Sequence, residues 1–331
     1  MQIDINAAIV HVLDTAVDEP VLSQLPLVIS DDTLQYLANH AAKCFTSDEA
    51  KACTLSEDSM FAPLLWNLEE GFTAKTATIA RDWFSILHEN PSIPAGDVVF
   101  LLMNIDGADY LAALKMNYKV GYVHYFAMED GVTRNDIVRQ NAVLPGNMGK
   151  ADEAFFVNIS TKEVRCIEKK YEIDARKASY LATRLLGCKT GLSPKEKMAA
   201  IKAVAGEVNQ QFYGNTGVDE PELAAAVCEE YYAREDKDAP VPVKNICEKL
   251  YGDMPHAREA FTKALAEREI TIEDELPLRS NLVHRLEKQS LRSGDGVEIK
   301  VPVNLYKDAD AIEFIRNDDG TMSLLIKNIL M

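Results

Sequence analysis

Glu298 and Lys300 have the spacing that comes closest to a catalytic site. An acid and a lysine two residues apart on a strand, with a second acid from a neighbouring strand, can hold Mg²⁺ and activate water in a nuclease. Asp295 or Asp310 could supply the second acid. The same spacing occurs on the solvent face of an ordinary strand, because alternate side chains point to one side. We prefer the ordinary strand and keep a metal-dependent nuclease as an alternative.

Other catalytic patterns are incomplete in this chain. Gly146 and Gly149 precede Lys150, but a phosphate-binding loop needs four residues between its glycines and a Ser or Thr after the lysine. Here two residues intervene and Ala151 follows. The His-Glu pair that begins at His88 has no second histidine at the spacing of a zinc protease. We therefore predict no catalytic residues, no cofactor and no bound metal.

The cysteines show no metal-binding spacing. No CxxC pair occurs among the six, which are Cys44, Cys53, Cys166, Cys188, Cys228 and Cys247. Zinc at the first two would need two further ligands, and the sequence nearby offers only His40. Without a recognisable secretion signal, scattered cysteines are usually small core residues. We predict that all six are reduced.

A basic segment is the feature that most favours contact with nucleic acid. Residues 162–202 contain eleven Lys or Arg against five Asp or Glu, a local charge of +6 that leaves −23 on the rest of the chain. Cations with an interleaved aromatic side chain suit contact with phosphates and with bases or sugars. The predicted nucleic-acid-binding residues are Arg165, Lys169, Lys170, Arg176, Lys177, Tyr180, Arg184, Lys195 and Lys202.

Helical spacing predicts how the centre of this segment is arranged. Arg176, Tyr180 and Arg184 recur at i, i+4 and i+8, so they share one face of a helix. Leu181 and Leu185 belong to a different face, which we expect in the core. The alternative is a solvated helix face whose cations pair with the many carboxylates of this protein.

The whole-chain properties describe an acidic globular protein. The net charge of −17 repels polyanions and argues against coating DNA by charge alone. The 331 residues suffice for roughly two domains of about 150 residues each. No apolar run approaches the ~18 residues of a membrane span, and the first residues have no signal-peptide pattern. We therefore expect a cytoplasmic protein with no membrane partner.

The pattern of elements predicts an α+β fold, with an antiparallel sheet and flanking helices, a helical domain and C-terminal strands. Apolar stripes indicate helices near 34–41 and 72–88. Short apolar runs indicate strands at 5–13, 97–105, 110–117, 122–128, 154–159 and 163–168. Asp106-Gly107 is a hairpin-turn signal between two of them.

Helical periodicity replaces these short runs from about residue 173. Ser193 to Glu196 has the spacing of a capping box with proline at the first helical position. Strand-like runs return at 297–303, 312–316 and 322–329. The expected domains are 1–170, an α+β sheet domain; 171–275, a helical domain; and 276–331, a C-terminal β segment.

Three segments resemble a known family. They are AIVHVLDTAVDEPVLSQLPL (residues 8–27), DARKASYLATRLLGCKTGLSPKEKMAAIKAV (residues 174–204) and MSLLIKNIL (residues 322–330). In order and spacing they are similar to the bacterial nucleoid-associated, NdpA-like family. The resemblance implies a cytoplasmic protein of the nucleoid, with DNA or nucleoid proteins as partners and no established catalytic residues.

The leading hypothesis is therefore a non-catalytic, nucleoid-associated binding protein that contacts DNA or DNA-bound proteins. One alternative is an acidic adaptor that binds a basic DNA-processing protein, and the other is the nuclease. The sequence leaves the oligomeric state open, with a homodimer as one option.

Overall fold

A computed structural model gives the fold of the chain as two compact units, residues 1–193 and 194–331. None of the helices that it describes has the length and apolar content needed to span a bilayer. The residues described are 1–213, 219–237, 239–292, 295–305, 308, 310–317 and 322–328. Each unit is a separate arrangement of helices and strands.

The first unit is built on an eight-stranded sheet in which every neighbouring pair is antiparallel. In spatial order its strands are β12 (Cys188–Thr190), β3 (Lys51–Leu55), β9 (Glu163–Ile167), β8 (Glu153–Asn158), β5 (Ala108–Asn117), β4 (Gly96–Ile105), β1 (Ile3–Leu13) and β2 (Val21–Leu22). The β4–β5 turn at Asp106-Gly107 has positive φ at both residues, so the predicted hairpin is confirmed.

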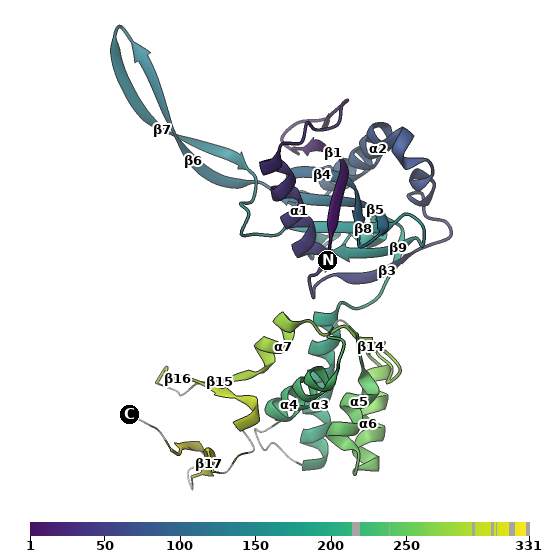
Figure 1. Cartoon of the computed structure of the whole chain (residues 1–331), viewed down its shortest axis with the longest axis vertical. Helices are drawn as coiled ribbons and strands as arrows, with labels where there is room; N and C mark the ends of the chain where they lie inside the picture. The colour runs from purple at the N-terminus through teal and green to yellow at the C-terminus, as the bar shows by residue number, and fades with distance from the viewer. Residues whose placement is uncertain are drawn as a thin grey trace. The chain divides into compact units, whose positions relative to one another are not determined.

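Helices cover both faces of this sheet (Figure 1). Alternate residues of β4 enter different cores: Phe100 packs with Trp83 of α2 (Leu68–Glu89), while Leu101 packs with Leu37 of α1 (Asp31–Phe45). Both predicted helices are confirmed. A short 3₁₀ turn, η1 (Ala62–Leu65), precedes α2. Because both faces are covered, the central strands read as continuous apolar runs rather than alternating ones.

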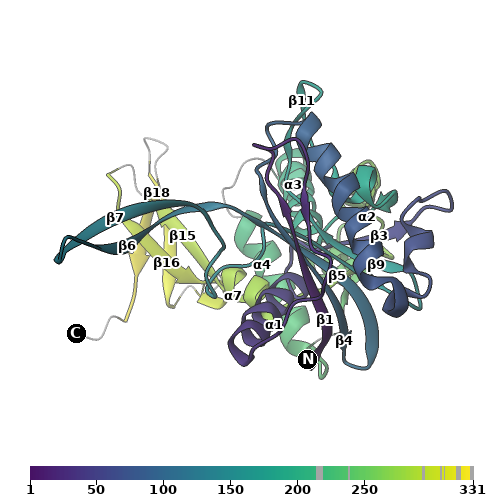
Figure 2. The same cartoon turned by 90° about the horizontal axis from the view of Figure 1, so that it is seen from above.

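Strands β6 (Lys119–Glu129) and β7 (Val132–Val143) form a two-stranded sheet of their own. They extend from the first unit as a long arm (Figure 2). The predicted strand at 122–128 is confirmed as a strand, but it lies outside the main sheet.

The helix expected across Arg176 to Arg184 is wrong. This stretch contains strand β11 (Arg176–Ala178), paired with β10 (Tyr171–Ile173), and then one π-helical turn, η2 (Leu181–Leu185). The apolar spacing of Leu181 and its neighbours is satisfied by this single turn, which packs into the core on the α2 side of the sheet. With β12 the chain returns to the main sheet, so residues 171–193 belong to the first unit.

The second unit contains the predicted helical run. Its helices are α3 (Pro194–Tyr213), α4 (Asp219–Ala233), α5 (Val243–Tyr251), α6 (Pro255–Ala266) and α7 (Ser280–Leu286). Its two-stranded antiparallel sheets are β13 (Val241–Pro242) with β14 (Glu275–Leu276), β15 (Lys288–Arg292) with β16 (Glu298–Pro302), and β17 (Ile312–Arg316) with β18 (Met322–Ile326). A 3₁₀ turn, η3 (Val303–Leu305), follows β16. The α+β class predicted from the sequence is confirmed.

Candidate nucleic-acid interface

The β10–β11 hairpin presents the exposed cations of the basic segment. Lys170, Arg176 and Lys177 are exposed and form no ion pair with any residue that the structure describes. Within the ladder, Lys177 lies opposite Glu172 and Arg176 lies opposite the buried Ile173. The buried Ile173 therefore fixes the hairpin to the core while the cations remain in solvent.

Two further predicted cations flank this hairpin and are paired. Lys169 Nζ lies 2.5 Å from Asp152, and Arg184 lies 2.6 Å from Asp174 in the hairpin turn. Lys169 and Arg184 are both exposed, so these ion pairs orient the side chains but contribute little to stability. The structure thus brings Lys169, Arg184 and the three unpaired cations to one region of the first unit.

Tyr180 is not part of that surface, which corrects the prediction of an exposed aromatic residue. Its side chain is fully buried. Its hydroxyl accepts a hydrogen bond from Trp83 Nε1 at 3.0 Å and donates one to Glu153 Oε2 at 2.8 Å. The residue follows β11 closely, so it anchors the basic hairpin in the core and cannot stack on a base.

Glu153 also forms a buried ion pair. Lys115 Nζ lies 3.3 Å from Glu153 Oε2, and both side chains are fully buried. The two residues are cross-strand partners on β5 and β8, and Lys115 also donates to the Pro94 carbonyl oxygen at 2.9 Å. Burial lowers the pKa of Lys115 and raises the pKa of Glu153. The anchor of the hairpin is therefore a desolvated polar network, in which each member depends on its partners.

The remaining predicted residues lie elsewhere. Arg165 on β9 is half-buried, donates to the Phe45 carbonyl oxygen at 2.8 Å and lies 4.8 Å from the centre of the Phe45 ring. Lys195 and Lys202 are exposed on α3, in the second unit. Arg165 is therefore held against Phe45, and Lys195 and Lys202 belong to the other unit.

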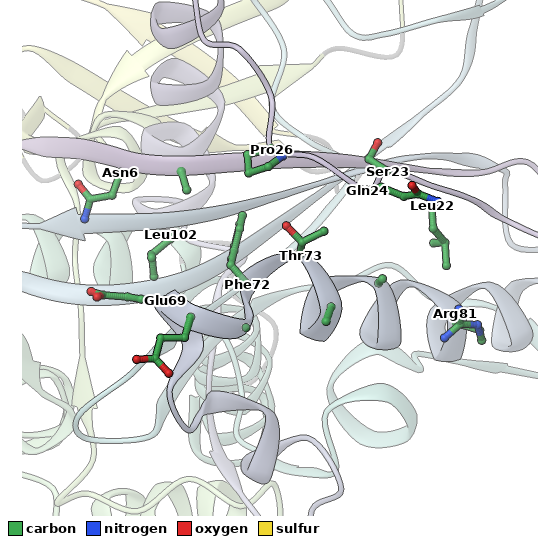
Figure 3. Close-up of a pocket in the computed structure, with 15 residues that line it drawn as sticks. Asn6, Leu22, Ser23, Gln24, Pro26, Glu69, Phe72, Thr73, Arg81 and Leu102 are labelled. Carbon is green, nitrogen blue, oxygen red and sulfur yellow. The ribbon is translucent and has the colours of Figure 1, made fainter.

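A groove along α2 was missed by the sequence reasoning. It has a volume of about 930 Å³ and lies between α2 and the β1–β2 segment, with Ser23 and Gln24 on one wall and Glu69 and Thr73 on the other (Figure 3). A second hollow of about 560 Å³ continues it along α2. Its acidic lining is Asp18, Glu19 and Glu89. No local pattern reveals such a groove, because its walls come from separate elements.

His11 joins the two walls of this groove. It is fully buried in β1, and its Nδ1 accepts a hydrogen bond from the Ser23 backbone N–H at 3.1 Å. The ring proton is then on Nε2, which lies 3.2 Å from the Thr76 hydroxyl on α2. Burial lowers the pKa of His11 to about 4, so the imidazole is neutral at pH 7.

The comparison with protein families gives a match over nearly the whole chain. The model described as "Nucleoid-associated protein YejK" matches residues 9–330. The chain belongs to this nucleoid-associated protein family. The match covers the three segments on which the resemblance rested, except for Ala8 at the start of the first one. No curated protein matches the chain.

The nuclease pattern is not assembled in this family member. Glu298 and Lys300 are both exposed on β16, as the period of a strand requires. Asp295 and Asp310 are exposed as well. In the part of the chain that the structure describes, no three His, Cys, Asp or Glu side chains are placed to hold a metal ion. The described residues therefore give the nuclease alternative no support.

The six cysteines are free thiols, and all but Cys228 are buried. Burial raises the pKa of Cys44 to about 11 and that of Cys53 to about 12. Thiols with such values are almost wholly protonated at neutral pH and are poor nucleophiles.

Proposed function

We propose that this chain is a non-catalytic protein of the bacterial nucleoid that contacts the phosphate backbone of DNA through the β10–β11 hairpin. The observation that carries the proposal is the exposure of Lys170, Arg176 and Lys177 on a small hairpin fixed to the core. The family match supports the nucleoid as the site of action.

The charge distribution indicates a weak and local contact. The chain as a whole is −17, so only the hairpin region attracts a polyanion. Each phosphate neutralised on duplex DNA contributes about 0.9 to the slope of log K against log salt. Three to five cations therefore predict a slope of roughly −2.7 to −4.5, much shallower than that of a protein with an extensive DNA interface.

Reversal of the hairpin charges tests the proposal. Arg176→Glu with Lys177→Glu should lower DNA affinity at least about tenfold and reduce the salt slope by about 2. The matched control is Lys162→Glu with Lys189→Glu, two other exposed cations of the same unit. The control changes the net charge equally. Lys189 pairs with Thr54, which in turn pairs with Glu163 at the start of β9, whereas the hairpin follows the other end of β9.

Equal loss of affinity in both double variants would contradict a hairpin-specific contact, and so would an unchanged affinity in the hairpin variant. Circular dichroism and thermal unfolding of each variant confirm that the comparison is made between folded proteins.

The groove along α2 favours a second candidate, the acidic adaptor that binds a basic DNA-processing protein. The carboxylates Glu69, Glu70, Asp18, Glu19 and Glu89 line the two hollows and outnumber the cation Arg81, which lines both. Their charge suits a Lys- or Arg-rich segment of a partner. In pull-downs from nuclease-treated lysate, Glu69→Lys with Glu70→Lys should lose such a partner. The hairpin double variant should retain it.

A further inference from the structure

The β6–β7 arm is the most exposed apolar part of the first unit. It pairs with no other strand in the described chain, and none of its residues enters either core. At ~3.3 Å per residue, its strands extend for about 35 Å. A two-stranded sheet without further packing is marginally stable in water. We therefore expect the arm to be stabilised by packing against another protein surface.

One face of the arm carries large apolar side chains in a row. Tyr122, Phe126 and Met128 lie on the same side of β6 and are 69%, 66% and 73% exposed. Ile137, 74% exposed, lies on that side too, because it is the cross-strand partner of His124. We call these four residues the apolar arm face. His124, Asn135 and Arg139 lie among them on the same side. Large apolar side chains gathered on one exposed side of a soluble protein often mark an interaction site.

The charges of the arm are separated along its length. Lys119 and Arg139 lie in its base half, while Glu129 and Asp130 lie at its tip. The other two charges form an ion pair within β7, where Arg134 lies 3.2 Å from Asp136. The arm is thus neutral overall in a chain of −17, with a positive base and a negative tip.

We propose that the apolar arm face packs against the arm of a second copy of this chain, with the two arms antiparallel about a two-fold axis. A two-fold interface must be self-complementary, since each copy presents the same surface. In the antiparallel arrangement the negative tip of each arm meets the positive base of the other. The neutral arm also avoids the repulsion that two chains of −17 would meet elsewhere.

The size of the arm fits a dimer. An arm about 35 Å long and about 10 Å wide presents roughly 350 Å² on each side. Val123, Tyr125 and Val138 are exposed on the opposite side, which the face-to-face packing of the two arms leaves in solvent. One side of each arm therefore gives about 700 Å² over the two partners, below the ~1,200 Å² at which standard interfaces begin, which is the size of a weak dimer. DNA or a basic segment would instead meet an arm whose charges cancel.

Sedimentation of the full chain tests the interface directly. The wild-type protein should be dimeric at tens of micromolar. Ile137→Asp places a charge near the middle of each arm, where the two copies meet, and should weaken dimerisation at least tenfold. Met148→Asp is the matched control, because Met148 is 96% exposed on a loop outside the arm. It should leave the dimer intact.

A charge exchange tests the antiparallel arrangement. A base-reversed chain, Lys119→Glu with Arg139→Glu, and a tip-reversed chain, Glu129→Lys with Asp130→Lys, should each dimerise poorly alone. An equimolar mixture should form heterodimers, because each positive end then faces a negative end. The recovery should diminish in high salt.

A wild-type chain that stays monomeric at about 100 μM overturns the proposal, and so does a dimer that survives Ile137→Asp. Failure of the two charge-reversed chains to pair overturns the antiparallel packing. Neither result bears on DNA contact, which depends on the β10–β11 hairpin.

Discussion

Two hairpins of the first unit, β10–β11 and β6–β7, differ in their exposed side chains and in their attachment to the core. The β10–β11 hairpin is short, carries exposed cations and is fixed to the core by Ile173 and Tyr180. The β6–β7 arm is long, apolar and without any residue in the core. A charged surface functions in solvent and needs only to be held in place, whereas an apolar surface needs to be covered. The difference between the hairpins therefore indicates a polyanion for one and a protein surface for the other.

The largest effect is expected from the anchor of the short hairpin. Glu153→Ala leaves Lys115 buried without its ionic partner and should lower the free energy of unfolding by about 3–5 kcal/mol. The double variant Lys115→Met with Glu153→Leu should recover most of this loss, because it removes both buried charges. Urea unfolding measures both. A double variant as unstable as the single one would contradict this explanation. It would show that the hydrogen bonds and packing of the pair stabilise the fold beyond the neutralisation of one charge by the other.

Tyr180→Phe breaks the same anchor more gently. It removes the hydroxyl that joins Trp83 and Glu153 and leaves both partners buried with one hydrogen bond fewer. The expected loss is about 1–3 kcal/mol. Self-association through the arm should not change, because no arm residue contributes to this network. A parallel loss of dimerisation would mean that the two hairpins are coupled and the contrast between them is not valid.

The β4–β5 hairpin could be predicted from the sequence and the β10–β11 hairpin could not. The reason is that the first depends on local residues and the second on contacts between residues far apart in the sequence. Asp106-Gly107 and the apolar runs beside it fix the β4–β5 hairpin locally, so it could be predicted. The spacing of Arg176, Tyr180 and Arg184 also fits a helix, and the observed structure depends on contacts that no local pattern records. Tyr180 bonds Glu153 and Trp83, which are 27 and 97 residues away in sequence.

Acidification should lower the free energy of unfolding of the first unit through His11, which belongs to neither hairpin. Burial lowers the pKa of His11 from 6.5 to about 4. Between these values the unfolded chain binds a proton that the folded chain does not, so stability falls as the pH drops below 6.5. The slope is at most about 1.4 kcal/mol per pH unit. Urea unfolding at pH 7, 6 and 5 checks this, and His11→Gln should flatten the dependence. A slope that persists in that variant would assign the effect to other groups.

The two turns give the smallest and most direct comparison. The arm turns at Asp130-Gly131, with φ of 51° and 78°, while the short hairpin turns at Asp174-Ala175, with φ of 51° and 60°. The left-handed region costs alanine about 1–2 kcal/mol and costs glycine almost nothing. Glycine also makes the unfolded chain more flexible, which offsets about 0.4–1 kcal/mol. Ala175→Gly should therefore stabilise the first unit by roughly 0.5 kcal/mol, which is measured as a higher urea midpoint.

The reciprocal change, Gly131→Ala, introduces the same strain into a hairpin that has no anchor in the core. It should increase amide exchange along β6 and β7 and weaken dimerisation, while the urea midpoint of the unit stays nearly constant. If Gly131→Ala instead lowers the urea midpoint as much as a core substitution does, the arm folds cooperatively with the sheet. In that case the arm is stabilised by the unit itself and the argument that it needs a second copy fails.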